Sequence, residues 1–264
     1  MHRHEGEHRY DPIAIGCPAC GTPGRWAQPE KTLIPEKINN VETTIITSFT
    51  ELYTLLTKHW HSNFIYRGEN SDKYELRSTF GRDQFTNPKN NQVQERAYFE
   101  DFKKQALPYL EFHPQNQLDW LSVAQHHCLH TRLLDWTKNP LVAIYFAVKG
   151  TTKTDTVLYI LDARKLDKAD DDTDPFKIDK DLIYYPKHLT RRIIAQAGLF
   201  TLHSKPVEIF NHSALEKIVI KDTCRVNIQV TLNTFNINQF SLFPSLEGLA
   251  DTLTYDWIWK TKPL

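Results

Sequence analysis

The chain has 264 residues, of which 40% are hydrophobic, and its 32 acidic and 32 basic side chains give a formal net charge of zero. This length suffices for one large domain, or for a domain with a small appendage, and the balanced charge argues against a strongly basic nucleic-acid binder. No apolar run is long enough to span a bilayer, four cysteines are too few for a disulfide scaffold, and the N-terminus lacks the apolar segment of a signal peptide. We therefore expect a cytoplasmic protein with no membrane partner.

Residues 1–42 are predicted to be an N-terminal extension, separate from a domain over residues 43–264. The extension contains a CxxC motif, Cys17 to Cys20, and three histidines stand upstream of it: His2, His4 and His8. Two thiolates from one such turn supply half of a tetrahedral zinc site. Pro18, Pro23, Pro29 and Pro35 in the same stretch favour a flexible loop instead. A zinc site at Cys17 and Cys20 and an irregular extension both stay open.

The first half of the domain is predicted to mix helices with a strand. Ser48 and Glu51 form a capping box, which places the first helix near Thr47. The segment Asn63–Arg67 is typical of a short strand that ends at Gly68. Two amphipathic helices are expected next, over Gln92–Ala106 and Leu118–His127.

The second half adds strands and ends on helices. Pro140–Val148 is nearly all apolar, and Asn139 before Pro140 favours a helix because Asn caps and Pro suits the first turn. Ile193–Leu202 indicates two strands, or one strand bent at Gly198. The remaining expected elements are strands over Thr156–Leu161 and Glu216–Ile220, and helices over Val226–Phe235 and Leu246–Trp257. This mixed order favours the α+β class.

Arg67 stands at the end of the apolar strand Phe64–Arg67, where a charge is costly without an anionic partner. A guanidinium at a strand end suits recognition of a phosphate or carboxylate, and Gly68 beside it lets a ligand or another backbone approach. A structural ion pair with a core carboxylate explains the same arginine. The residues alone leave these two interpretations evenly balanced.

A polar stretch from Ala124 to Thr137 is flanked by apolar runs, so its side chains are expected to be half-buried and hydrogen-bonded to one another. Its histidines, His126, His127 and His130, raise the possibility of a metal. Adjacent helical side chains point about 100° apart, however, and rarely share one ion. Arg132 and Asp135 are a candidate structural pair.

Two later segments also contain unexpected polar residues. Gln196 lies in an apolar run, just after a basic cluster formed by Lys187, His188, Arg191 and Arg192. This cluster is either a solvated face or a contact for an anionic acceptor such as nucleic acid. Glu247 lies in the apolar stretch Leu242–Ala250, where it is a helix-start charge stabilised by the dipole or a residue facing the site.

Four segments together resemble the FRG domain family: FIYRG, AQHHCLHTRLLDWTKNPLVAIYFAV, RIIAQAGLF and LFPSLEGLA. They occur in the family's order and cover roughly residues 48–255. Two departures are visible, because the family usually has Gly where Cys128 stands and Pro where His130 stands.

The resemblance implies an ADP-ribosyltransferase-like split sheet flanked by helices and a NAD-dependent transferase. Arg67 with Gly68 would then hold NAD, while His127, Thr137 and Tyr145 would line the pocket. The segment expected to supply a catalytic Glu offers Arg192 and Gln196 instead, so Gln196 or the later Glu247 is the candidate for stabilising the oxocarbenium ion.

Similar proteins act as toxins in toxin–antitoxin–chaperone defence against phage. The resemblance therefore implies an RNA or protein acceptor and possible antitoxin and chaperone partners. Two alternatives remain: a non-catalytic FRG module that binds a nucleotide or another anion, and a nuclease or hydrolase that uses the histidines.

Overall fold

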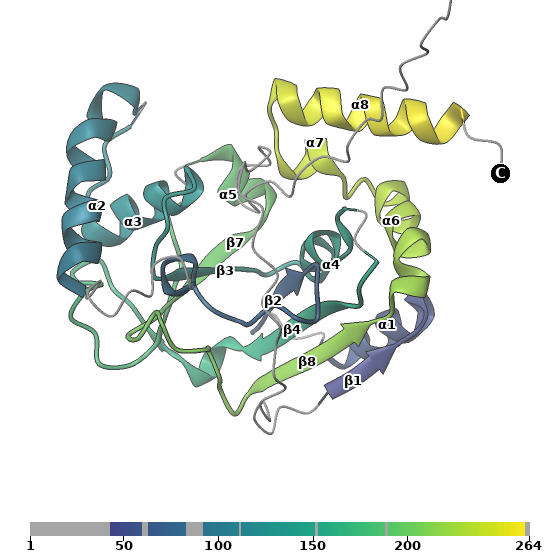
Figure 1. The fold of residues 1–264 in the computed structure, drawn as a ribbon, viewed down its shortest axis with the longest axis horizontal. Helices are drawn as coiled ribbons and strands as arrows, with labels where there is room; N and C mark the ends of the chain where they lie inside the picture. The colour runs from purple at the N-terminus through teal and green to yellow at the C-terminus, as the bar shows by residue number, and fades with distance from the viewer. Residues whose placement is uncertain are drawn as a thin grey trace, which may run out of the picture.

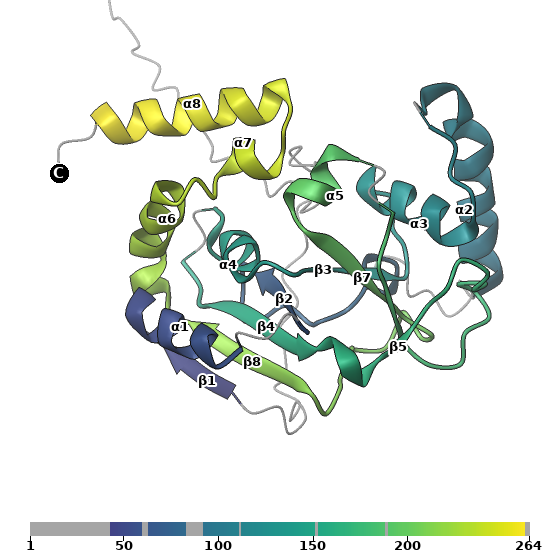
Figure 2. The ribbon, with the colours of Figure 1, turned by 180° about the vertical axis from the view of Figure 1, so that it is seen from behind.

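The computed structural model describes residues 43–59, 63–82, 92–110, 112–150, 153–187 and 190–261. The strands are β1 (Thr43–Ile46), β2 (Phe64–Glu69), β3 (Leu133–Thr137), β4 (Thr156–Asp162), β5 (Asp167–Lys168), β6 (Leu182–Tyr184), β7 (Gly198–Leu202) and β8 (Leu215–Ile220). The α-helices are α1 (Phe49–Leu56), α2 (Gln92–Ala106), α3 (Gln117–His126), α4 (Pro140–Val148), α5 (Arg191–Ala195), α6 (Arg225–Thr234), α7 (Gln239–Leu242) and α8 (Leu246–Thr261). Figures 1 and 2 show these elements from opposite sides.

One mixed sheet organises the described part of the chain, with strand order β1-β8-β4-β2-β3-β7-β6-β5. β1 with β8 and β5 with β6 run parallel, and the other neighbours are antiparallel. The central neighbours β2 and β3 share a single registered pair, Tyr66 with Thr137. By contrast, β2 pairs with β4 over six residues and β3 pairs with β7 over five. The sheet is therefore nearly divided into two halves that separate just beyond Tyr66.

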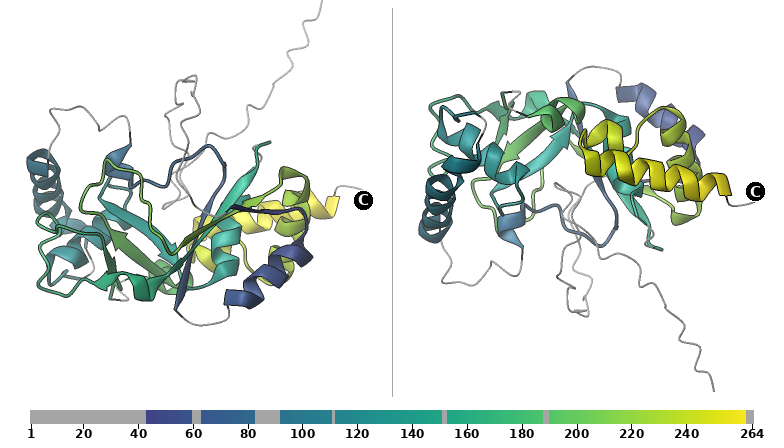
Figure 3. Two further views of the ribbon diagram at one scale, coloured as in Figure 1. Left: turned by 90° about the horizontal axis from the view of Figure 1, so that it is seen from below. Right: turned by 90° about the horizontal axis from the view of Figure 1, so that it is seen from above.

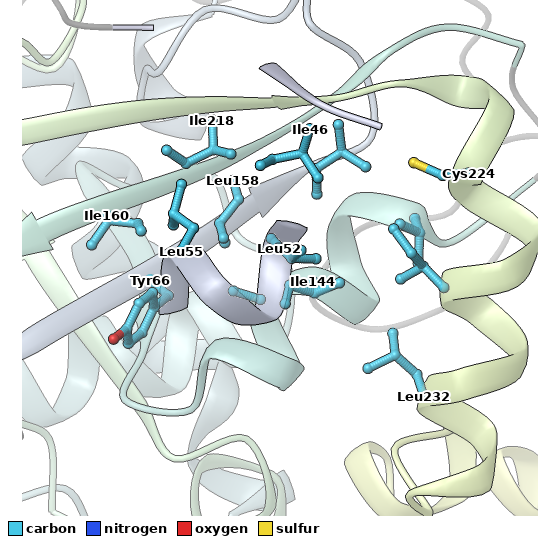
Figure 4. Close-up of a cluster of buried hydrophobic side chains, with 14 residues drawn as sticks. Ile46, Leu52, Leu55, Tyr66, Ile144, Leu158, Ile160, Ile218, Cys224 and Leu232 are labelled. Carbon is cyan, nitrogen blue, oxygen red and sulfur yellow. The ribbon is translucent and has the colours of Figure 1, made fainter. Parts of the chain in front are cut away.

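Helices cover one face of each half-sheet. α1, α4 and α6 pack on β1, β8, β4 and β2, in a cluster that includes Leu52, Ile144 and Ile218 (Figure 4). α2 and α3 cover the other half-sheet, through Phe99 and Leu121. The opposite face is shared by both halves and is covered by loops rather than helices (Figure 3). This arrangement confirms the α+β class.

The helix starts follow the predicted capping residues. Ser48 accepts a hydrogen bond from the Glu51 backbone N–H at the start of α1. The carboxylate of Glu51 reaches back to the Thr47 N–H, one residue earlier than a capping box requires. Asn139 caps α4, with Pro140 in the first turn. The predicted helices Gln92–Ala106 and Pro140–Val148 have the predicted bounds.

Several sequence predictions need correction. Residues 193–195, expected in a strand, belong to α5, because the Thr190 hydroxyl accepts from the Ile193 N–H and starts a helical turn. The strand begins only at Gly198. Strand β1, which was not predicted, precedes the first predicted helix. β2 also continues through Gly68 to Glu69.

Candidate functional site

Arg67 lies where the two half-sheets separate, and its side chain is only 10% exposed. Its Nε donates to a Glu69 carboxylate oxygen over 2.8 Å, and Nη2 lies 2.7 Å from the same oxygen. Nη1 donates to the Asp135 carbonyl over 2.7 Å and lies 3.8 Å from the Asp135 carboxylate. Burial opposes the charge, but the two carboxylates outweigh it and raise the pKa of Arg67. The guanidinium therefore forms the internal ion pair that was one of its two predicted interpretations.

Gly68 is needed because a helix backbone approaches it. A Cβ atom at this position would lie 1.9 Å from the Ala143 carbonyl oxygen and 2.5 Å from the Ala147 nitrogen, both in α4. The absent side chain thus lets α4 pack against β2. Of the two predicted reasons for the glycine, the close approach of another backbone is the one that the structure shows.

Asp135 connects Arg67 to helix α3. Its carboxylate accepts a 2.8 Å hydrogen bond from Gln125 Nε2, and Gln125 Oε1 accepts from the Thr131 hydroxyl over 2.7 Å. The Asp135 side chain is 48% exposed, so this carboxylate is both anchored and accessible to solvent. Asp135 was not predicted as a partner of Arg67, although a lone carboxylate in an apolar strand was the available signal.

Arg132 does not pair with Asp135, and that prediction is wrong. Arg132 is fully buried and donates through Nε to a Glu95 oxygen at 3.0 Å, with a second short contact between Nη2 and the other Glu95 oxygen. Its Nη1 donates to the carbonyls of Pro175 and His203. The ion pair between Glu95 and Arg132 therefore attaches helix α2 to the start of strand β3.

A second group of motif residues meets around Phe243, beyond the C-terminus of α7. The Arg192 guanidinium carbon of α5 lies 4.6 Å from the Phe243 ring centroid, and Lys149 Nζ lies 5.1 Å from it, just after α4. Phe243 is buried. Lys149 also donates to the Gln239 side-chain oxygen over 3.1 Å, which is a neutral partner. Two cations are thus held over one aromatic ring, where cation–π attraction is favourable; we call Arg192, Lys149 and Phe243 the Phe243 cluster.

Three predicted site residues lie beside this cluster with their polar groups engaged. The Thr137 hydroxyl donates to the Gln196 carbonyl over 2.6 Å and accepts from the Asn139 N–H. The Gln196 side chain donates to the Leu242 carbonyl over 3.1 Å. The Tyr145 hydroxyl donates to Gln239 over 2.6 Å, and burial followed by the charge of Asp251 raises the pKa of Tyr145. These side chains therefore hold α4, α5 and α7 together.

His126 and His127 lie at the C-terminal end of helix α3, close enough to Arg192 to feel its charge. Burial, the positive charge of Arg192 and the neighbouring His127 together lower the pKa of His126 to about 4. Burial and Arg192 also lower the pKa of His127. Both imidazoles are consequently neutral at pH 7, when they can donate or accept a hydrogen bond. The described residues contain no group of three or more His, Cys, Asp or Glu side chains that could hold a metal ion.

Among the described residues, no hydrogen bond or ion pair joins Glu247 to Arg67. It is exposed in the first turn of α8, and a hydrogen bond from Ser245 lowers its pKa. Its position agrees with the predicted helix-start charge rather than with a residue facing a site. The CxxC at Cys17 and Cys20 and the basic residue His188 lie outside the described residues.

The chain is an α+β domain with a nearly divided sheet. Arg67, paired internally with Glu69 and Asp135, lies at the division, and the Phe243 cluster forms a second group of cations. Residues 62–156 match the FRG domain family, in agreement with the resemblance that the motifs indicated. The match contains the Arg67 strand, α3 and α4, while α5 and the Leu242–Ala250 segment lie beyond it. No curated protein and no solved structure matches the chain. Within the described segments, every helix is too short or too polar to cross a membrane.

The end of α3 explains one departure from the family's usual sequence. Cys128 has a left-handed backbone, with φ of 65°. The Leu129 N–H donates to the Ala124 carbonyl, and the Cys128 N–H donates to Gln125, which is the Schellman pattern of a helix end. Glycine, the family's usual residue here, adopts this conformation without the penalty that a Cβ atom imposes.

We therefore expect Cys128→Gly to raise the free energy of unfolding by about 1 kcal/mol. The measurement is urea denaturation followed by circular dichroism. Ala97→Gly, at an exposed position within α2, is the control and should lose about 1 kcal/mol because glycine weakens a helix interior. If both variants were destabilised equally, relief of the left-handed strain could not be the dominant effect.

Proposed function

We propose that this domain is a non-catalytic module that binds an anionic ligand of the nucleotide class at the Phe243 cluster. The observation behind the proposal is that Arg192 and Lys149 lie over one buried ring, at 4.6 and 5.1 Å from its centroid. Guanidinium and ammonium groups both form charge-assisted hydrogen bonds with phosphate oxygens, so two cations at one ring favour a phosphate-bearing ligand. Neutral His126 and His127 nearby add uncharged donors.

The internal pairing of Arg67 weighs against the transferase mechanism. Glu69 and Asp135 already satisfy the guanidinium that would have to hold the dinucleotide. Glu247 is exposed, and Gln196 uses its amide to bind Leu242, so neither candidate for the oxocarbenium role contacts Arg67. The ADP-ribosyltransferase remains a second candidate because the sheet divides beside Arg67 and leaves the Asp135 carboxylate accessible.

We expect pyrophosphate and ADP to bind this protein, with Arg192→Gln and Lys149→Gln each weakening the affinity about tenfold or more because each removes one charge-assisted contact. Isothermal titration calorimetry measures the affinity. Lys168→Gln is the matched control, since Lys168 also lies over an aromatic ring, Tyr185, but outside the Phe243 cluster. A bound anion near Arg192 should also raise the pKa of His126, which NMR titration of the imidazole follows.

Incubation with NAD distinguishes the two candidates. Binding of NAD with no release of nicotinamide supports the module. Release of nicotinamide that is lost in Asp135→Asn, with the Arg192 and Lys149 variants unaffected, would instead assign a transferase centred on Arg67. Equal ligand affinity in Arg192→Gln, Lys149→Gln and Lys168→Gln would overturn the proposed site.

A further inference from the structure

Gln239, the first residue of helix α7, connects that helix to α4 and to the residue just after it. Its side-chain oxygen accepts a 2.6 Å hydrogen bond from the Tyr145 hydroxyl and a 3.1 Å hydrogen bond from Lys149 Nζ. Figures 1 and 2 show α7 next to α5 and over α4, the arrangement that brings these segments together. Gln239 therefore lies beside the Phe243 cluster without being one of its cations.

These two contacts fix the orientation of the Gln239 amide. An ammonium group only donates hydrogen bonds, so the amide atom that faces Lys149 must be the oxygen rather than the nitrogen. The Tyr145 hydroxyl, which is able to donate or accept, then donates to the same oxygen. The nitrogen Nε2 is consequently the other branch of an amide that is held in one defined orientation.

The amide nitrogen of Gln239 keeps its N–H donors available. Among the described residues, both side-chain hydrogen bonds of Gln239 end on the oxygen, and none leaves Nε2. Nε2 is not one of the described polar atoms that are buried without a partner, so it is accessible to solvent. Because the oxygen is held from two sides, the side chain loses little further freedom when a ligand binds. Gln239 thus presents a preorganised, uncharged donor beside Lys149.

The charges around this donor favour an anion with several oxygens. Lys149 and Arg192 supply two positive charges at the Phe243 ring. One acidic side chain also acts on this side of α4, because the charge of Asp251, after burial, raises the pKa of Tyr145. The two cations outnumber that exposed carboxylate. A phosphate group accepts hydrogen bonds from ammonium, guanidinium and amide donors alike, so all three kinds of donor suit it.

We propose that Gln239 is a third ligand-binding residue at the Phe243 cluster, and that Arg192, Lys149 and Gln239 together recognise the terminal phosphate of a nucleotide. This inference rests on the proposed function. The three side chains come from three different segments, and a terminal phosphate offers three unesterified oxygens to them. A phosphate inside a diester offers only two. ADP therefore satisfies the site better than ADP-ribose or NAD, which bind more weakly.

Isothermal titration calorimetry with the full chain compares ADP with ADP-ribose, in which the same terminal phosphate is esterified. ADP should bind about tenfold more tightly or better. Gln239→Met, which keeps the length of the side chain but removes its donors, should weaken ADP binding about tenfold and reduce the preference for ADP. Because glutamine is uncharged, that reduced preference reports a lost hydrogen bond rather than a lost charge. Gln94→Met makes the same change at an exposed position of α2 and should leave both affinities unchanged.

A double-mutant cycle separates direct contact with the ligand from support of Lys149. Gln239→Met should still weaken ADP binding in a Lys149→Gln background. No further effect there would mean that Gln239 acts only by holding Lys149, which would overturn the inference.

The comparison of the two ligands on the unaltered chain needs no variant, so it decides the matter even if Gln239→Met perturbs α7. Equal affinity for ADP and ADP-ribose would overturn the inference and leave the proposed function standing. Equal binding of ADP by the unaltered chain and by Arg192→Gln would instead overturn the proposed function, and the inference with it.

Discussion

Glu95→Gln should lower the free energy of unfolding by about 3–5 kcal/mol, because it leaves the charge of Arg132 buried without its carboxylate. Arg132 is fully buried and Glu95 is 2% exposed, so water cannot replace the lost partner. The carbonyls of Pro175 and His203 keep two hydrogen bonds to the guanidinium but provide no negative charge. Urea denaturation measures the loss, and hydrogen exchange should show it first in α2, which Glu95 attaches to the sheet.

Two further variants separate the charge effect from simple loss of contacts. The double variant Glu95→Met with Arg132→Met should be more stable than Glu95→Gln, because replacing both members of a buried pair with apolar groups removes the unpaired charge. Asp101→Asn breaks the exposed pair with Lys104 on the same helix and should change stability by less than about 1 kcal/mol. A loss for Glu95→Gln as small as that for Asp101→Asn would show that the buried pair contributes little.

Much of the fold could be predicted from the sequence where local chemistry and tertiary packing agree. Asn139 and Pro140 specify a helix start by themselves, and the apolar residues that follow them are buried as a helix. The predicted bounds of α4 were therefore correct. α5 was missed because its apolar run continues into β7, and only the Thr190 cap marks the helical turn. Ala197 follows that turn in a left-handed backbone conformation, with φ of 46°. An alanine gives no sequence signal for this conformation, which glycine usually adopts.

The site was less predictable because its contacts join distant segments. Asp135 reaches Arg67 across 68 residues of sequence, and Lys149 and Arg192 meet at Phe243 only after three helices have packed. One partner did have a local signal. Glu69 follows Arg67 by two residues on the same strand, so alternation places both side chains on one face, where they pair. The sequence therefore contained the internal carboxylate that competes with a ligand for this arginine.

Gly68→Ala should destabilise the protein by about 3 kcal/mol or more, because the new methyl group cannot fit beneath α4. Its Cβ would lie 1.9 Å from the Ala143 carbonyl oxygen, and that atom belongs to the helix backbone rather than to a flexible side chain. α4 would have to move away from β2, which would open the buried cluster around Ile144. Urea denaturation should show a lower midpoint of unfolding for Gly68→Ala. Circular dichroism without urea should still show the β-sheet signal of the folded protein.

Gly198→Ala, at the start of β7, is the matched control for this prediction. Its Cβ would lie 3.7 Å from the nearest atom, the Ile193 carbonyl oxygen, which is an ordinary contact, so we expect a change of less than about 1 kcal/mol. The comparison also tests what the glycine after Arg67 is for. A Gly68→Ala variant that kept its stability but lost ligand binding would mean that the glycine admits a ligand. A large loss of stability relative to Gly198→Ala would mean that it admits helix α4.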